Sequence, residues 1–244
     1  MSILYEPPPT EYDLKFVLFD IPVRIHPLFW LFSILFGLRL GDVHAIVLWV
    51  CAVLISVLVH ELGHSLMMQN FGQSSYIVLH TMGGMAVPTG SGWRRGRSSS
   101  VSTSNQQILI SLAGPFAGFA LAAIIMMVVR ALGGDTALPL LFGFIPFPQA
   151  ALPYPGRINL FIDFMLWTNV FWGLINLLPV YPLDGGQAIR QVFLQLDPWG
   201  GIRKSLWLSV IAGSAAAILG FVFLGSLWMA LLFGILAIQS YQRL

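Results

Sequence analysis

The feature that most constrains this fold is a series of long apolar segments that carry almost no charge. Residues 45–59 contain only apolar side chains, one serine and Cys51, and residues 206–239 contain no charged side chain. Charged residues make up 9% of the chain, whereas an ordinary soluble domain has about 25%. So few charges cannot cover a water-exposed surface, and the segments are therefore expected to lie in lipid.

These segments predict an α-helical polytopic membrane protein. Inside a bilayer only helices and closed barrels satisfy their backbone hydrogen bonds, and the segments lack the alternation of barrel strands. We expect about six transmembrane helices, in residues 27–40, 45–71, 107–132, 159–178 and 206–239. The last segment is too long for one span at about 1.5 Å per residue. It is predicted to form a C-terminal helical hairpin over residues 205–240, with its turn near residues 220–225.

Two other segments predict β-structure. Residues 16–25 are interpreted as one short strand broken by Pro22. Residues 75–87 predict a small hairpin or sheet near the cytoplasmic face, with its turn around Gly83 and Gly84. The proline-rich residues 133–157 are expected to fold against the membrane surface. Together these features predict a single membrane-embedded domain over residues 1–244, with a core at residues 21–191.

The orientation follows from the distribution of Lys and Arg. With the N-terminus inside, nine basic residues fall on the cytoplasmic side, three of them in the serine-rich loop 93–105, and three fall outside. We therefore expect a multi-pass protein of a prokaryotic cell membrane with both termini in the cytoplasm. The lone cysteine, Cys51, is interpreted as a small packing residue.

The second predicted span contains the sequence His60-Glu61-Leu62-Gly63-His64. Histidines four residues apart lie on one face of a helix, so both rings can bind one metal ion. Placing a charged group in mid-span costs roughly 2.5 kcal/mol or more. Such groups persist where a metal binds them, so the motif predicts a zinc site, with Glu61 placed to take a proton from water.

A catalytic zinc site takes three protein ligands, so a third must come from elsewhere. Asp184 follows the fourth predicted span on the side toward which the second span descends. This topology places it at a depth similar to that of the histidines, which makes it the candidate. Of the other histidines, His26 is expected to cap the first helix, and His80 to be a hydrogen-bonded strand residue.

The motifs together resemble the site-2 protease family of intramembrane zinc metalloproteases. The resemblance covers residues 21–191 and rests on the His60–His64 motif and three other segments, which are Met82-Gly-Gly-Met-Ala, Ser111-Leu-Ala-Gly-Pro115 and residues 176–186. It implies one zinc ion per chain, held by His60, His64 and Asp184, with Glu61 as the general base. It also implies that Asn176 donates a hydrogen bond to the substrate or oxyanion. The sequence resembles a short form of the family, without a PDZ or CBS domain.

The function implied is hydrolysis of peptide bonds in or near the transmembrane segment of a single-pass membrane protein within the lipid bilayer. Nucleic acid is not an expected partner. A helical substrate must be unwound before cleavage, and the predicted hairpin can hold it as an extended strand. Ser65, Gln69 and Asn70 are expected to line a route for water. The alternative is a zinc transporter or a metal-sensing membrane protein, in which the same three residues bind zinc in transit.

Overall fold

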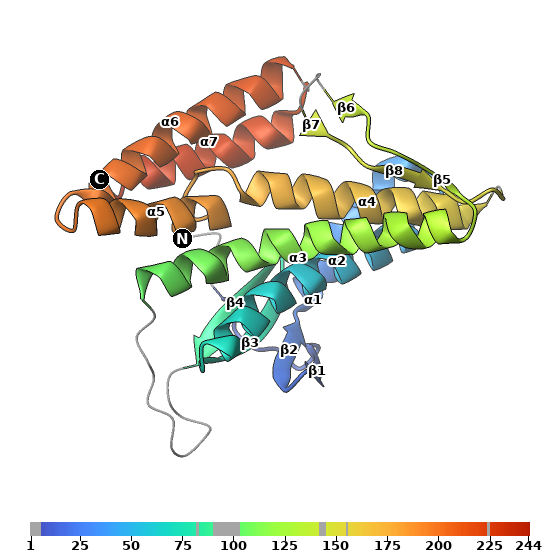
Figure 1. Cartoon of the computed structure of the whole chain (residues 1–244), viewed down its shortest axis with the longest axis horizontal. Helices are drawn as coiled ribbons and strands as arrows, with labels where there is room; N and C mark the ends of the chain where they lie inside the picture. The colour runs from blue at the N-terminus through green and yellow to red at the C-terminus, as the bar shows by residue number, and fades with distance from the viewer. Residues whose placement is uncertain (1–5, 82, 90–102, 142–144, 155, 224) are drawn as a thin grey trace. The chain divides into compact units, whose positions relative to one another are not determined.

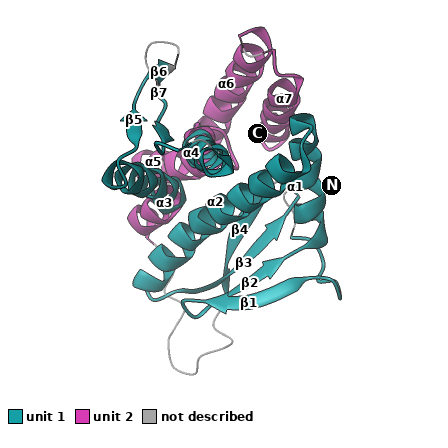
Figure 2. Cartoon of the chain, turned by 90° about the vertical axis from the view of Figure 1, so that its right-hand side faces the viewer, with its two compact units in different colours: residues 1–100, 113–173 teal, residues 101–112, 174–244 magenta. Residues whose placement is uncertain are grey.

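The computed structural model describes residues 6–81, 83–89, 103–141, 145–154, 156–223 and 225–244. Its internal contacts divide the chain into two compact units (Figure 2). Unit 1 contains residues 1–100 and 113–173, and unit 2 contains residues 101–112 and 174–244. The single domain of residues 1–244 stays a prediction. Most of the predicted basic loop 93–105 lies outside the described residues.

Among the described residues, four helices are long and apolar enough to cross a membrane (Figure 1). They are α2 (Val43–Asn70), α3 (Ser104–Ala131), α4 (Arg157–Asn176) and α6 (Gly201–Val222). Two shorter apolar helices are α1 (Pro27–Gly37), which continues into the 3-10 turn η1 (Leu38–Leu40), and α7 (Leu227–Tyr241). Gly225, with φ of 59°, lies between α6 and α7, which confirms the predicted break in the last apolar segment.

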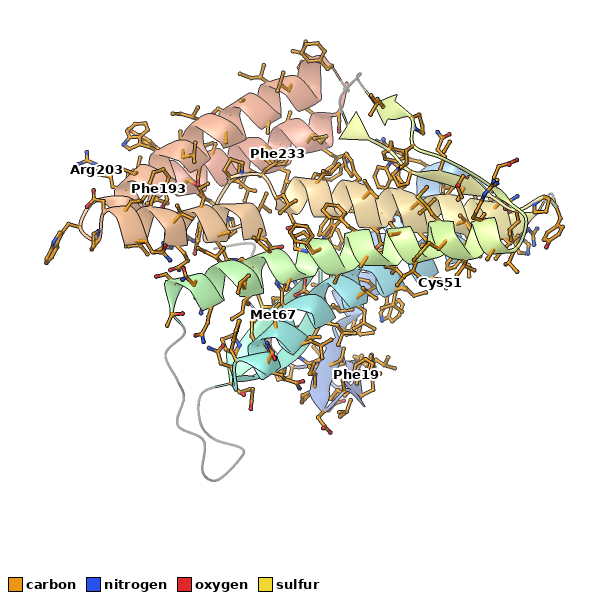
Figure 3. All side chains as sticks on the ribbon, viewed as in Figure 1. Phe19, Cys51, Met67, Phe193, Arg203 and Phe233 are labelled. Atoms are coloured by element: carbon orange, nitrogen blue, oxygen red, sulfur yellow. The ribbon has the colours of Figure 1, made fainter. Side chains whose placement is uncertain are left out.

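Large apolar side chains are exposed along these helices. Met127 of α3 is 63% exposed, and Val222 of α6 is 65% exposed. Extensive apolar exposure of this kind suits a lipid environment, so the chain is a membrane protein. The prediction that Cys51 packs internally is wrong, because its side chain is exposed on α2 (Figure 3). Lipid accepts a small hydrophobic side chain on the outer face of a helix as readily as the protein interior does.

Unit 1 contains a four-stranded sheet in the order β1-β2-β3-β4. Its strands are β1 (Leu14–Leu18), β2 (Ile21–Ile25), β3 (Ser74–His80) and β4 (Gly83–Thr89). The β2–β3 pair is parallel and the other two pairs are antiparallel. The pairing of β3 with β4 confirms the predicted hairpin. The predicted turn around Gly83 and Gly84 is wrong, because both glycines belong to β4, where they pair with His80 and Leu79.

The prediction of one strand over residues 16–25 is wrong, because the chain reverses there. Phe19 (labelled in Figure 3) and Asp20 have φ of 50° and 63° and form a two-residue turn between β1 and β2. Positive φ at both central positions is the geometry that joins twisted antiparallel strands. Such turns normally carry Gly or Asn, so Phe19-Asp20 gives no sequence signal for one.

One face of the sheet packs against α2 (Figure 2). Alternate residues of β2 and β3 are fully or almost fully buried, and they meet Val57 and Leu62 of α2. The strand residues are Ile21, Val23, Ile25, Ile77 and Leu79. This apolar contact fixes the sheet beside the part of α2 that carries the histidine motif.

The residues before β1 are tied to the sheet by charged side chains. Arg24 of β2 donates hydrogen bonds to Glu6 Oε1 at 2.7 Å and to Asp13 Oδ2 at 3.0 Å. The Tyr76 hydroxyl of β3 donates to Glu6 Oε2 at 2.7 Å. Burial raises the pKa of Asp13, but hydrogen bonds from Thr10 and Arg24 outweigh it and lower the pKa to about 2. The Asp13 carboxylate is therefore charged at neutral pH and keeps its bond to Arg24.

Residues 133–157 form two small antiparallel ladders in their described part. Strand β5 (Asp135–Ala137) pairs with β8 (Gln149–Ala151), and β6 (Leu140–Leu141) pairs with β7 (Ile145–Pro146). That this segment lies against the membrane surface stays a prediction.

Unit 2 is built on the antiparallel pair α6 and α7. Phe233 is fully buried in their interface, where it joins a cluster with Val180 and Leu236 (Figure 3). The loop before α5 (Asp184–Leu196) is anchored through Tyr181. The Tyr181 N–H donates to Ser209 Oγ of α6 at 3.0 Å, and its carbonyl accepts from Ser240 Oγ of α7 at 3.4 Å.

Helix α5 is absent from the helices that the sequence predicted. Its apolar residues recur at helical spacing, at Ala188, Ile189, Val192, Phe193 and Leu196. The other face is polar, so the segment does not resemble a membrane span. This periodicity is a usable signal for an amphipathic helix. A search for long continuous apolar segments misses such a helix.

Candidate metal centre

The two motif histidines of α2 point toward one another. His60 and His64 are 4% and 7% exposed, and their Nε2 atoms lie 3.2 Å apart. A tetrahedral zinc ion with Zn–N bonds of about 2.0–2.1 Å holds two nitrogens about 3.3 Å apart. The observed separation fits two nitrogens bound to one ion, so these residues can hold zinc through Nε2.

Gly114 of α3 provides the space beside these nitrogens. A Cβ atom at this position would overlap His64 Nε2 and would lie 2.8 Å from His60 Nε2. Helices α2 and α3 also approach closely at Gly63, where a Cβ would lie 2.5 Å from the Ala113 carbonyl oxygen. The missing side chain of Gly114 therefore leaves room beside both Nε2 atoms.

We expect Gly114→Ala to lose most of the metal. The added methyl group must displace an imidazole from its observed position, and zinc ligands tolerate shifts of only a few tenths of an ångström. Zinc per chain, measured on purified protein, should fall to less than about a tenth of the wild-type value.

The matched control for this substitution is Gly118→Ala, one helical turn further along α3. There an added Cβ would lie 3.3 Å from the Asn169 carbonyl oxygen and would touch neither histidine. Its zinc content should stay near that of the wild type. Equal zinc in both variants would contradict the role assigned to Gly114.

Glu61 lies between the histidines in sequence and faces the edge of the sheet. It is 5% exposed. A Cβ atom at Gly84 of β4 would overlap Glu61 Cγ and would lie 2.8 Å from Glu61 Oε1. The carboxylate is therefore held directly against strand β4. Glycine at position 84 permits this approach, and the sequence alone did not indicate it.

Asp184 and Asn176, the other predicted site residues, belong to unit 2. Asn176 is the last residue of α4 and Asp184 is the first residue of α5, and they are 9% and 8% exposed. Gly185 and Gly186 pack tightly on the preceding loop, where added Cβ atoms would overlap the backbone of Leu177 and Val180. The local fold thus buries both side chains. Their roles at the metal stay predictions.

The remaining histidines near the sheet have other positions. His26 caps α1, as predicted, because its Nδ1 accepts from the Leu28 N–H at 3.2 Å. His80 ends β3 and is 5% exposed. Burial lowers the pKa of His80, and electrostatic interactions with the neighbouring His26 and Arg24 lower it further. His80 is therefore neutral at neutral pH.

The residues expected to line a water route have different environments. Ser65 is fully buried, and its hydroxyl has no hydrogen-bond partner among the described residues. Gln69 donates to the Phe19 carbonyl at 3.2 Å, which commits its amide to the β1–β2 turn. Asn70 is exposed at the end of α2. The water route stays a prediction.

The sequence did not predict a buried polar contact between α4 and α2 inside unit 1. Asn169 of α4 is 3% exposed and donates to Ser56 Oγ of α2 at 2.8 Å. Ser56 precedes His60 by one helical turn, so this bond joins α4 to α2 next to the histidines. The available signal was an asparagine within an apolar span, which is expensive to bury without a partner.

Several known proteins are similar to this chain. The model of peptidase family M50 matches residues 48–211. A zinc metalloprotease of Methanocaldococcus jannaschii is 23% identical over 87% of this chain and 54% of its own length. A putative zinc metalloprotease of Synechocystis is 28% identical over 72% of this chain and 41% of its own length. The chain thus spans about half the length of the curated relatives it matches.

A solved structure has the same fold. The site-2 protease from Methanocaldococcus jannaschii matches with a TM-score of 0.54 and 22% identity. The match covers 95% of this chain and 94% of that one. It supports the predicted class of a helical membrane protein with a small sheet.

Proposed function

Because the chain belongs to peptidase family M50, we propose that it is an intramembrane zinc metalloprotease. It hydrolyses peptide bonds in or near the transmembrane segment of membrane-protein substrates. The observation that carries this proposal is the pair of Nε2 atoms 3.2 Å apart on a helix long and apolar enough to cross a membrane, with Glu61 next to His60 in the sequence. Metal ligands and a carboxylate inside an apolar helix suit chemistry at the level of the bilayer.

We propose that the protein holds one zinc ion through His60, His64 and Asp184. Two imidazoles and one carboxylate are a ligand set found in catalytic zinc sites, which keep a fourth position open. Asp184 is buried as the first residue of α5, directly after the loop that Tyr181 anchors. Bound zinc supplies Lewis acidity and a water molecule with a lowered pKa.

Glu61 acts as the general base. Its carboxylate accepts the proton of the attacking water and returns a proton to the leaving amine. Its enclosure beside Gly84 limits its motion, so it stays close to the scissile bond. Asn176 donates a hydrogen bond from its side-chain amide to the substrate carbonyl oxygen, where negative charge develops.

The substrate binds as an added strand along β4. The sheet order leaves β4 at an edge, whereas β3 lies between β2 and β4. Pro88 pairs with Ser75 of β3 and has no N–H, which suits a position whose N–H would point away from β3. Residues two apart along a strand direct their N–H groups to the same side, so Ala86 and Gly84 also direct theirs away from β3. These N–H groups are available to hydrogen-bond a substrate backbone. Because Gly84 lies against the Glu61 side chain, a substrate strand bound there would pass close to Glu61.

We expect Ala86→Pro to impair cleavage without loss of zinc. Proline removes the outward N–H donor while leaving the bonds to β3 in place. Cleavage of a membrane peptide should fall by about tenfold or more, because one lost hydrogen bond and a distorted edge weaken substrate binding. Ala86→Val keeps the N–H and serves as the control. Full activity in Ala86→Pro would move substrate binding away from β4.

The competing function is zinc transport or metal sensing. A transport path needs further ligands in series, and α3, α6 and α7 contain no His, Cys, Asp or Glu. Detergent-purified protein given a peptide with one transmembrane segment distinguishes the two functions. Zinc-dependent cleavage supports the protease. Zinc uptake by proteoliposomes with no cleavage would support the transporter.

We propose six spans in a prokaryotic cell membrane. The nine-to-three basic bias supports a cytoplasmic location for both termini. Single cysteines at Ser99 and Gln149, introduced into a Cys51→Ser background, should label from opposite sides of the membrane. Gln149 is suitable because it is exposed, whereas its neighbour Ala150 is 4% exposed. Cytoplasmic labelling should occur at position 99. Labelling of both positions from one side would rule out this arrangement.

A further inference from the structure

Two arginines of unit 2 lie over one tyrosine ring. The guanidinium carbons of Arg190, from α5, and Arg243, beyond α7, are 5.4 and 4.9 Å from the centre of the Tyr181 ring. Their separation is therefore no more than about 10 Å, which is close to the Debye length of about 8–10 Å at physiological salt. Two positive charges are held together here.

No described carboxylate pairs with either arginine. The carboxylate of Asp197, in the turn after α5, pairs with Lys204 Nζ at 2.9 Å. The face of the aromatic ring attracts both guanidinium groups, but it carries no net charge. The pair therefore keeps its full positive charge among the described residues, and a ligand that supplies negative charge would relieve the repulsion.

The ring itself is fixed in place. The Tyr181 N–H and carbonyl are bonded to Ser209 of α6 and Ser240 of α7, and both serines are 1% exposed or less. Arg190 is half-buried and Arg243 is exposed. The ring is thus fixed by both helices, and Arg243 beside it is accessible, which limits the ordering required when a ligand binds.

Aromatic side chains at this end of unit 2 are typical of a membrane interface. Trp207 of α6 and Tyr241 of α7 form an edge-on pair with ring centres 6.2 Å apart. Trp199, just before α6, is 99% exposed. Trp, Tyr and basic residues gather at the headgroup level where apolar helices leave the bilayer. Figure 3 labels Arg203 at this end of α6.

We propose that Arg190 and Arg243, held over Tyr181, bind the phosphate of an anionic phospholipid headgroup. The planar guanidinium group matches phosphate oxygens with two parallel hydrogen bonds, and two such groups surround one phosphate. A lipid is preferred to free phosphate because Arg243 lies two residues after Tyr241, which pairs with Trp207 of α6, a helix long and apolar enough to cross a membrane. An acyl chain can follow the apolar helices while the headgroup stays at the arginines.

The test measures phosphatidylglycerol retained by the detergent-purified chain, by native mass spectrometry over a lipid titration. Arg190→Gln and Arg243→Gln should each weaken binding by about tenfold, since each removes a charge-assisted contact. Arg203→Gln is the matched control, because it removes one positive charge from the same end of unit 2 without touching the ring. It should change binding by less than about twofold.

Further measurements distinguish a phospholipid ligand from free phosphate and from a general effect of positive charge. Phosphatidylcholine should bind more weakly than phosphatidylglycerol, and inorganic phosphate should not displace the bound lipid at matched concentration. Arg190→Lys and Arg243→Lys, which keep the charge, should bind with intermediate strength, while thermal unfolding reports whether each variant is folded.

Equal losses in Arg203→Gln and Arg243→Gln would overturn the site. Displacement of the lipid by inorganic phosphate would overturn the lipid as its ligand.

Discussion

Replacing any one of His60, His64 and Asp184 by alanine is expected to remove most of the zinc from the purified protein. With two ligands left, the site loses both a bond and the geometry that fixes the others, so zinc per chain should fall to less than about a tenth. The Nε2 atoms of the two histidines already lie 3.2 Å apart, as two nitrogens bound to one zinc ion do.

The matched control for this series is His44→Ala. His44 lies in the first turn of the same helix, its side chain is 61% exposed, and it contacts Asp42. Zinc should stay at the wild-type level in this variant. Wild-type zinc in Asp184→Ala would contradict its assignment as the third ligand, and wild-type zinc in both histidine variants would remove the site altogether.

Glu61→Gln should separate metal binding from chemistry. Glutamine is nearly the same size, and position 61 is not a proposed ligand, so zinc should remain. Cleavage should fall by about 10²- to 10⁴-fold, because the base that accepts the proton of the attacking water is lost. Asn176→Ala should also keep zinc and lose about 10²-fold in rate, as expected for one donor to a developing oxyanion.

Glu6→Gln is the control for the Glu61 substitution. Glu6 bonds to Arg24 and Tyr76 on the sheet and has no contact with the histidine motif among the interactions described. Its substitution should leave the cleavage rate near that of the wild type. A Glu61→Gln protein that cleaves at the wild-type rate would exclude the proposed proton transfer.

Much of the fold could be predicted because membrane helices leave a strong local signal. Twenty or so continuous apolar residues have few alternatives in lipid, and this located α2, α3, α4 and α6. The β1–β2 turn was missed because its left-handed positions carry Phe19 and Asp20. Helix α5 was missed because it is amphipathic and short, and so depends on packing against its neighbours.

The metal site was predictable to the extent that it lies in one turn of one helix. The spacing of His60 and His64 alone places both rings on one face. The features that complete their surroundings come from other elements. Gly84 and Gly114 touch Glu61 and the histidines only through tertiary packing, and the bond from Asn169 to Ser56 joins residues 113 positions apart. A sequence gives no register between separate helices, so these contacts could not be derived from it.

We propose that zinc held by this chain enables Glu61 to promote hydrolysis of a peptide bond. The most direct test removes zinc with a chelator, restores it in steps, and measures bound zinc and cleavage of a membrane peptide in the same sample. The proposal predicts that cleavage rises in proportion to bound zinc and saturates at one ion per chain, with no recovery in Glu61→Gln at full occupancy. Cleavage that persists without zinc, or a fully loaded wild-type protein that cleaves nothing, would contradict it.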